Sequence, residues 1–176
     1  MDDKANAQAL VRREIIESLD REFARLHLSS CAVIENTPGD LLYSTTPSTQ
    51  SGALPSKALS SVGENILRCA AAIEQTFGGI TSNLWDDPFE WTLPEYLTTP
   101  AKVIAHLTEV EETRKRAFSS FAGDDCLLKH VATPAGETRP LGELLRETLA
   151  RGAEYQGQAV AVLKFLSGIS QPGFII

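Results

Sequence analysis

The sequence predicts an all-α fold, in which four helices form a bundle. Apolar residues recur at intervals of three and four over four stretches, which is the spacing of one face of a helix. These stretches cover approximately residues 8–28, 61–78, 99–122 and 140–167. No stretch shows the strong alternation of apolar and polar residues that is typical of a half-buried strand. Helices with one apolar face bury it most simply against one another, so a bundle is the expected architecture.

The first predicted helix is followed by a long connection. Its core positions are Val11, Ile15, Ile16, Leu19, Phe23 and Leu26. Pro38-Gly39-Asp40 is a turn signal, and residues 44–60 are rich in Ser, Thr, Pro and Gly without any period. A connection of this length favours a crossover rather than a simple up-down-up-down bundle.

The second and third predicted helices carry clear start signals. Ser61-Val62-Gly63-Glu64 is a capping-box pattern, in which Ser61 and Glu64 each satisfy a free backbone donor. Gly78-Gly79 is the expected stop of this helix. Thr99 followed by Pro100 predicts the start of the third helix, with threonine as the cap and proline at the first position.

The fourth predicted helix has a narrow apolar seam. Its positions alternate steps of four and three: Leu141, Leu145, Thr148, Gly152, Tyr155, Ala159, Val162 and Leu166. Gly152 and Ala159 have small side chains, which allow a neighbouring helix to approach closely. The seam therefore predicts a helix packed inside a bundle.

The bulk composition indicates one soluble domain, 1–176, and excludes two classes of partner. The formal net charge of −7 argues against a nucleic-acid groove, which neutralises phosphates with Lys and Arg. No apolar run approaches the ~20 residues that span a bilayer, and the first residues do not resemble a signal peptide. Cys31, Cys69 and Cys126 are odd in number and far apart, which favours free thiols and a cytoplasmic location. A homodimer is a further expectation.

Residues 140–158 resemble the last helix of the DinB/YfiT-like superfamily of four-helix bundles. That helix ends with a His, three residues, a second His and then Arg-Gly-Gln. In this chain Gly157-Gln158 match its end, Gln156 stands for the Arg, and Arg151 and Tyr155 stand for the two histidines. The segment 61–68 is similar to the start of the family's second helix, where a third His would fall at Arg68. Leu41-Leu42-Tyr43 with Pro47 is similar to the segment after its first helix.

The resemblance implies a metal site that this chain has lost. The family's three histidines typically bind a divalent metal such as zinc or nickel, and its better-understood members resemble metal-dependent thiol transferases or isomerases. Here the three positions are Arg68, Arg151 and Tyr155. Arginine stays cationic and offers no lone pair to a metal. We therefore expect a degenerate, metal-free site without a cofactor.

Two interpretations of the substituted site remain open. Arg68 follows Glu64 by four residues and Arg151 follows Glu147 by four, the spacing of a helical ion pair, while Glu154 lies three beyond Arg151. The favoured interpretation is an internal network, because each arginine has a carboxylate within reach. The other is a pocket in which a guanidinium binds the carboxylate or phosphate of a small anionic molecule.

An enzyme with a displaced site is the alternative hypothesis. His106 and Glu109 lie three apart on the third helix and could supply half of a metal site, which would favour a metal- or thiol-dependent transferase or hydrolase. Cys69 falls on the apolar stripe of the second helix and is expected to behave as a small hydrophobic residue. The charges at 109–112 and 114–116 are expected to form a solvated face.

Overall fold

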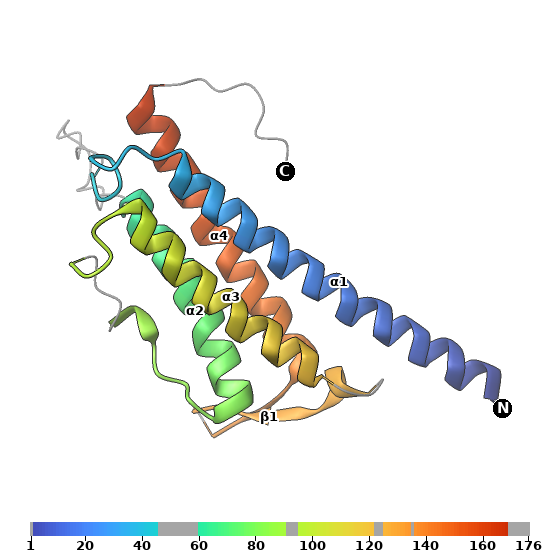
Figure 1. Cartoon of the computed structure of the whole chain (residues 1–176). Helices are drawn as coiled ribbons and strands as arrows, with labels where there is room; N and C mark the ends of the chain where they lie inside the picture. Colours follow the sequence, from blue (N-terminus) through green and yellow to red (C-terminus); the bar gives the residue numbers. More distant parts are fainter. Residues whose placement is uncertain (1, 46–59, 91–94, 122–124, 135, 169–176) are drawn as a thin grey trace, which may run out of the picture.

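The computed structural model describes residues 2–45, 60–90, 95–121, 125–134 and 136–168. The fold is mostly helical (Figure 1), as the sequence predicts, with α1 at Asp2–Glu35, α2 at Val62–Ser82, α3 at Pro100–Ser120 and α4 at Leu141–Ser167. Single 3₁₀ turns are η1 at Pro88–Glu90 and η2 at Cys126–Leu128. A small antiparallel hairpin, β1 at His130–Ala132 and β2 at Thr138–Pro140, precedes α4. Within the described ranges no helix is long and apolar enough to cross a membrane.

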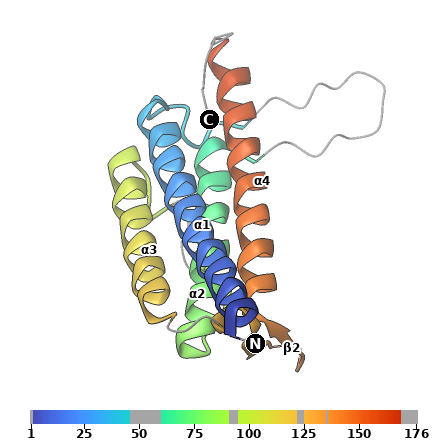
Figure 2. The ribbon, with the colours of Figure 1, turned by 90° about the vertical axis from the view of Figure 1, so that its right-hand side faces the viewer.

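The four helices do not follow a simple up-and-down order. α1 and α4 run in one direction, and α2 and α3 run in the other (Figures 1 and 2). α2 packs against both α3 and α4, and α1 lies between α3 and α4 on the opposite side. The end of α1 meets the starts of α2 and α3, where the Gly63 amide donates to Leu42 and the Tyr43 hydroxyl donates to Leu97. The predicted crossover falls largely on residues 46–59, which lie outside the described part of the chain.

The starts of α2 and α3 were predicted from their caps, whereas both bounds of α1 were missed. Ser61 and Glu64 form the predicted capping box, and Thr99 caps α3. α1, however, extends from residue 2 to residue 35 rather than from 8 to 28, because nothing before Pro38 interrupts it.

The predicted stop of α2 at Gly78-Gly79 is wrong. α2 continues to Ser82, and Asn83 supplies the left-handed residue with φ 54°. Gly79 is needed for a different reason: a Cβ there would lie 2.3 Å from the Trp85 ring, so only glycine lets that ring pack on the helix.

Three phenylalanines from three helices form the centre of the core. Phe23 of α1, Phe77 of α2 and Phe118 of α3 have ring centroids 5.3 to 5.9 Å apart. Their tilted and edge-to-face contacts are the geometries that aromatic pairs prefer. This cluster fixes the positions of α1, α2 and α3 relative to one another.

The expected solvated face of α3 is partly buried. Arg114 is 3% exposed and Glu111 is 6% exposed. Arg114 donates to both carboxylate oxygens of Glu111, at 2.7 and 2.8 Å, and also binds Asp20 of α1. A buried charge is tolerated because it is paired and hydrogen-bonded in this way. The sequence pattern missed this network because one of its partners lies on another helix.

Most of the predicted seam of α4 is buried against α2 and α1, while Tyr155 and Leu166 are half-buried. Leu145, Thr148, Gly152, Ala159 and Val162 are all buried. A Cβ on Gly152 would lie 2.8 Å from Leu26 of α1 and 3.4 Å from the Cys69 sulfur of α2. Three helices therefore approach one another closely at Gly152.

The same substitution at two glycines of α4 should have opposite effects on stability. Gly152→Ala should lower the free energy of unfolding by about 1–2 kcal/mol, because overpacking against Leu26 outweighs the gain in helix propensity. Gly157→Ala should raise it by about 0.5–1 kcal/mol, because nothing lies within 4 Å of a Cβ there. Urea unfolding of the two variants measures both values. Equal effects at the two positions would contradict the close approach at Gly152.

Candidate functional site

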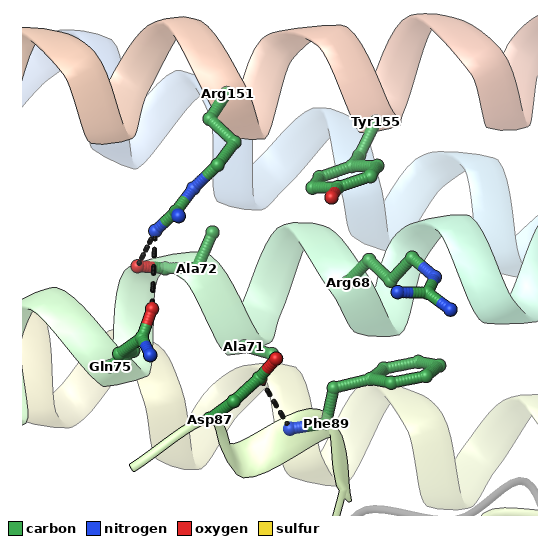
Figure 3. Close-up of a pocket in the computed structure, with 8 residues that line it drawn as sticks. All are labelled: Arg68, Ala71, Ala72, Gln75, Asp87, Phe89, Arg151 and Tyr155. Atoms are coloured by element: carbon green, nitrogen blue, oxygen red, sulfur yellow. Dashed lines mark hydrogen bonds between the residues drawn. The ribbon is translucent and has the colours of Figure 1, made fainter. Parts of the chain in front are cut away.

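The three positions singled out by the sequence line one small pocket. Arg68 of α2 and Arg151 and Tyr155 of α4 surround a hollow of about 40 Å³ (Figure 3). The remaining lining residues are Ala71, Ala72, Gln75, Asp87 and Phe89. The pocket thus lies between α2 and α4 and is closed on one side by the segment that follows α2.

Helical spacing and one close contact bring these residues together. Arg68 and Gln75 are seven residues apart on α2, and Arg151 and Tyr155 are four apart on α4, so each pair shares a helix face. Gln75 donates through Nε2 to the carbonyl oxygen of Trp85 at 2.9 Å. This bond and the packing of Trp85 on Gly79 hold the following segment against α2.

Arg68 stacks on an aromatic ring instead of forming the predicted ion pair. Its guanidinium carbon lies 4.0 Å from the centroid of the Phe89 ring (Figure 3). Glu64 does not reach it, because its carboxylate accepts the Ser61 amide at 2.8 Å as part of the capping box. Throughout the described segments, no carboxylate forms an ion pair with Arg68. The predicted Glu64–Arg68 pair is therefore wrong.

The predicted Glu147–Arg151 pair is also absent. Glu147 binds Arg139 of β2 at 2.5 Å, and Arg139 binds Glu143 at 2.7 Å as well. Glu154 accepts a bond from Gln158 at 3.4 Å. The hairpin brings Arg139 over the first turns of α4, where it competes for the carboxylate that the spacing assigns to Arg151.

Among the described residues, Arg151 therefore has only neutral acceptors. Its Nη2 lies 3.5 Å from the carbonyl oxygen of Ala72 and 3.5 Å from Oε1 of Gln75, distances at the long limit of a hydrogen bond. The side chain is exposed on the rim of the pocket. No ion pair to Arg151 is present within the parts of the chain that the structure describes.

Tyr155 and Asp87 complete the polar lining. The Tyr155 ring is half-buried, and its hydroxyl points from α4 into the pocket (Figure 3) without a hydrogen-bond partner among the described residues. Asp87 is exposed, and one of its carboxylate oxygens accepts the Phe89 amide at 3.0 Å. The described lining of the pocket thus carries two cations, one carboxylate and one hydroxyl.

The alternative pair, His106 and Glu109, lies away from this pocket. It faces Glu74 of α2, whose Oε2 is buried without a hydrogen-bond partner among the described residues. Burial raises the pKa of Glu74, while His106 acts in the opposite direction and Glu109 adds to the increase. No group of three or more His, Cys, Asp or Glu residues in the described segments is arranged to hold a metal ion.

Cys69 is packed as a small hydrophobic residue. It is 2% exposed, and burial raises the pKa of its thiol to about 12. A thiol acts as a nucleophile only as its thiolate, so Cys69 is protonated and inert at neutral pH. Cys31 and Cys69 are free thiols.

Sequence reasoning missed the residues that the segment after α2 contributes. Asp87 and Phe89 lie far from the matched family positions, and no periodic pattern places them on the pocket. Gln75 could have been found, because it lies two helical turns after Arg68 on the same face of the helix.

Comparisons with protein-family models, with curated proteins and with solved structures find no match to this chain. The resemblance to the DinB/YfiT-like superfamily therefore rests on the sequence motifs alone.

Removing the charge of Glu74 should stabilise the protein at neutral pH. Because the folded-state pKa is raised, the contribution of this carboxyl to stability is fully present below its ordinary pKa of 4.5 and is lost as the pH rises. Glu74→Gln should raise the free energy of unfolding by about 1 kcal/mol at pH 7, since a buried charged oxygen without a partner is removed. Urea unfolding should show this gain shrinking as the pH falls toward 4.5 and lost below it. Glu14→Gln, at an exposed position of α1 that forms no ion pair among the described residues, is the control and should change little.

Proposed function

We propose that the pocket between α2 and α4 binds a small anionic molecule through a carboxylate or phosphate group. One observation carries the proposal: Arg68 and Arg151 come from different helices, share a pocket, and are not ion-paired within the described residues. The internal network that the sequence favoured would have neutralised both charges. Its two carboxylates are bound elsewhere, so both guanidinium groups remain available to an anion.

The chemistry of the lining suits an oxyanion. A guanidinium presents a planar set of donors that matches the two oxygens of a carboxylate or phosphate. Stacking on Phe89 holds Arg68 in place, which reduces the side-chain entropy lost on binding. Within the described part of the chain Arg151 makes two long bonds, which it can exchange for a charged acceptor at little cost. The Tyr155 hydroxyl offers a further donor.

Asp87 sets a limit on the charge of the ligand. With Arg68 and Arg151 it leaves the pocket with a net charge of about +1, since nearby charges in a partly exposed site add in this way. A monoanion is therefore favoured over a dianion. A ligand that also carries a hydrogen-bond donor could use the second oxygen of Asp87.

We also infer that the chain is a divergent DinB/YfiT-like protein. The support is that Arg68, Arg151 and Tyr155, the residues matched to the family's metal ligands, line one pocket. In this proposal the positive charge that a metal supplies in the family is supplied by the two guanidinium groups. The role proposed is binding, with no catalytic step assigned.

Loss of either pocket arginine should weaken anion binding. Arg68→Ala and Arg151→Ala should each reduce the affinity for inorganic phosphate or acetate by about tenfold or more, because a hydrogen bond to a charged group contributes about 1.5–3 kcal/mol. Isothermal titration calorimetry on the full chain measures the effect. Arg146→Ala is the matched control: it removes the same charge from an exposed position of α4 outside the pocket. Equal losses in all three variants would overturn the proposal, since they would show only long-range attraction.

Asp87→Asn should tighten the binding of the same anions by about three- to tenfold. The amide oxygen of asparagine can still accept the Phe89 amide, so the local turn is kept while the negative charge is removed. Removing a repulsion of about 1 kcal/mol between Asp87 and the anion, as expected at a solvent-exposed site, changes the affinity by this factor. The same calorimetric titration measures it, and the gain should diminish at high salt. An unchanged affinity would show that the anion does not bind near Asp87.

A further inference from the structure

We propose that the anion bound at Arg68 and Arg151 carries an uncharged tail, and that this tail lies in a second hollow beside the first. The inference rests on the proposed function and specifies its ligand class. The second hollow has a volume of about 200 Å³ and lies between the start of α4, the middle of α2 and the hairpin. Its lining includes Thr76, Trp85, Thr133, Pro134, Leu144 and Thr148.

The two hollows share a wall. Gln75 and Arg151 line both of them. Gln75 is held by its bond to the Trp85 carbonyl, and its other end faces the guanidinium of Arg151 (Figure 3). A ligand whose anionic group binds Arg151 therefore has the larger hollow directly beside it.

Several polar groups of the larger hollow already form hydrogen bonds within the protein. The hydroxyls of Thr76 and Thr148 are 2.7 Å apart, and Thr148 also donates to the Leu144 carbonyl at 2.8 Å. The indole nitrogen of Trp85 donates to Asn83 at 3.2 Å. Since these donors already have acceptors within the protein, a ligand in the larger hollow does not have to supply polar groups for them.

Arg139 and Glu147 also line the larger hollow, and their charges are paired as well. Arg139 is bound by both Glu143 and Glu147, whereas Arg68 and Arg151 form no ion pair within the described residues. The two hollows therefore differ in charge. The smaller hollow carries the arginines without an ion pair among the described residues, and the larger one offers the Trp85 ring, Pro134 and Leu144.

The matching ligand is an amphipathic monoanion with a short tail. A volume of 200 Å³ corresponds to about six or seven water molecules at ~30 Å³ each, which suits a chain of several methylene groups. Each methylene that leaves water for an apolar surface improves binding about three- to fourfold. Affinity should therefore rise with tail length until the hollow is filled.

A series of straight-chain carboxylates tests the inference. Acetate, butyrate, hexanoate and octanoate are titrated into the full chain, and binding is followed by two-dimensional NMR, which detects weak complexes. All four should bind, and the dissociation constant should fall steeply from acetate to hexanoate and then level off. Signals of Thr76 and Thr148 should shift only with the longer members.

Two hairpin variants locate the tail. Thr133→Trp adds bulk inside the larger hollow and should remove the dependence on chain length while acetate still binds. Thr138→Trp adds the same bulk to an exposed position of the hairpin that does not line the hollow, and should leave the dependence intact. Thermal unfolding confirms that both variants are folded.

The outcomes separate this inference from the proposed function. If acetate binds and longer chains bind no better, the tail site is overturned and the anion pocket stands. If no member of the series binds, the anion pocket itself is overturned. If Thr133→Trp keeps the full dependence on chain length, the tail lies elsewhere and the assignment to the larger hollow is wrong.

Discussion

The close packing of α4 against α2 is the constraint on which the rest of the structure depends. At Gly152 the backbone of α4 comes close enough to Cys69 and Leu26 that a methyl group would not fit without a shift. One helical turn earlier, Thr148 reaches Thr76 through a buried hydrogen bond. These contacts fix how far apart the two helices lie beside the pocket that Arg68 and Arg151 line.

The segment after α2 closes one side of this pocket. Gly79 allows the Trp85 ring to pack on the helix, and Gln75 binds the Trp85 carbonyl. Phe89 is thereby placed under the guanidinium of Arg68. An aromatic ring stabilises a cation without neutralising its charge, so the contact orders Arg68 and leaves it able to bind an anion.

The structure accommodates the charges of its arginines in two different ways. Arg114 is buried, and both Glu111 and Asp20 bind it, so it serves the contact between α3 and α1. Arg68 and Arg151 keep access to solvent and form no ion pair within the described residues. A charge that water can reach needs no internal partner to be tolerated, and for that reason it can remain available to a ligand.

The sequence by itself determined the features that depend on neighbours along the chain. The helical periods, the capping box of Ser61 and Glu64, the Thr99 cap and the buried seam of α4 were all predicted, because each is decided within about one or two helical turns. The resemblance between short motifs also picked out Arg68, Arg151 and Tyr155, which proved to share a pocket.

Only the tertiary structure decided which charges meet. The spacing assigned Glu147 to Arg151, but the hairpin presents Arg139 to the same carboxylate, and a pair four residues apart is too weak to resist such a competitor. The burial of Arg114 and the contribution of Asp87 and Phe89 to the pocket likewise depend on elements distant in sequence. Helical period fixes which face a residue occupies, whereas ion pairing depends on every group that the fold brings to that face.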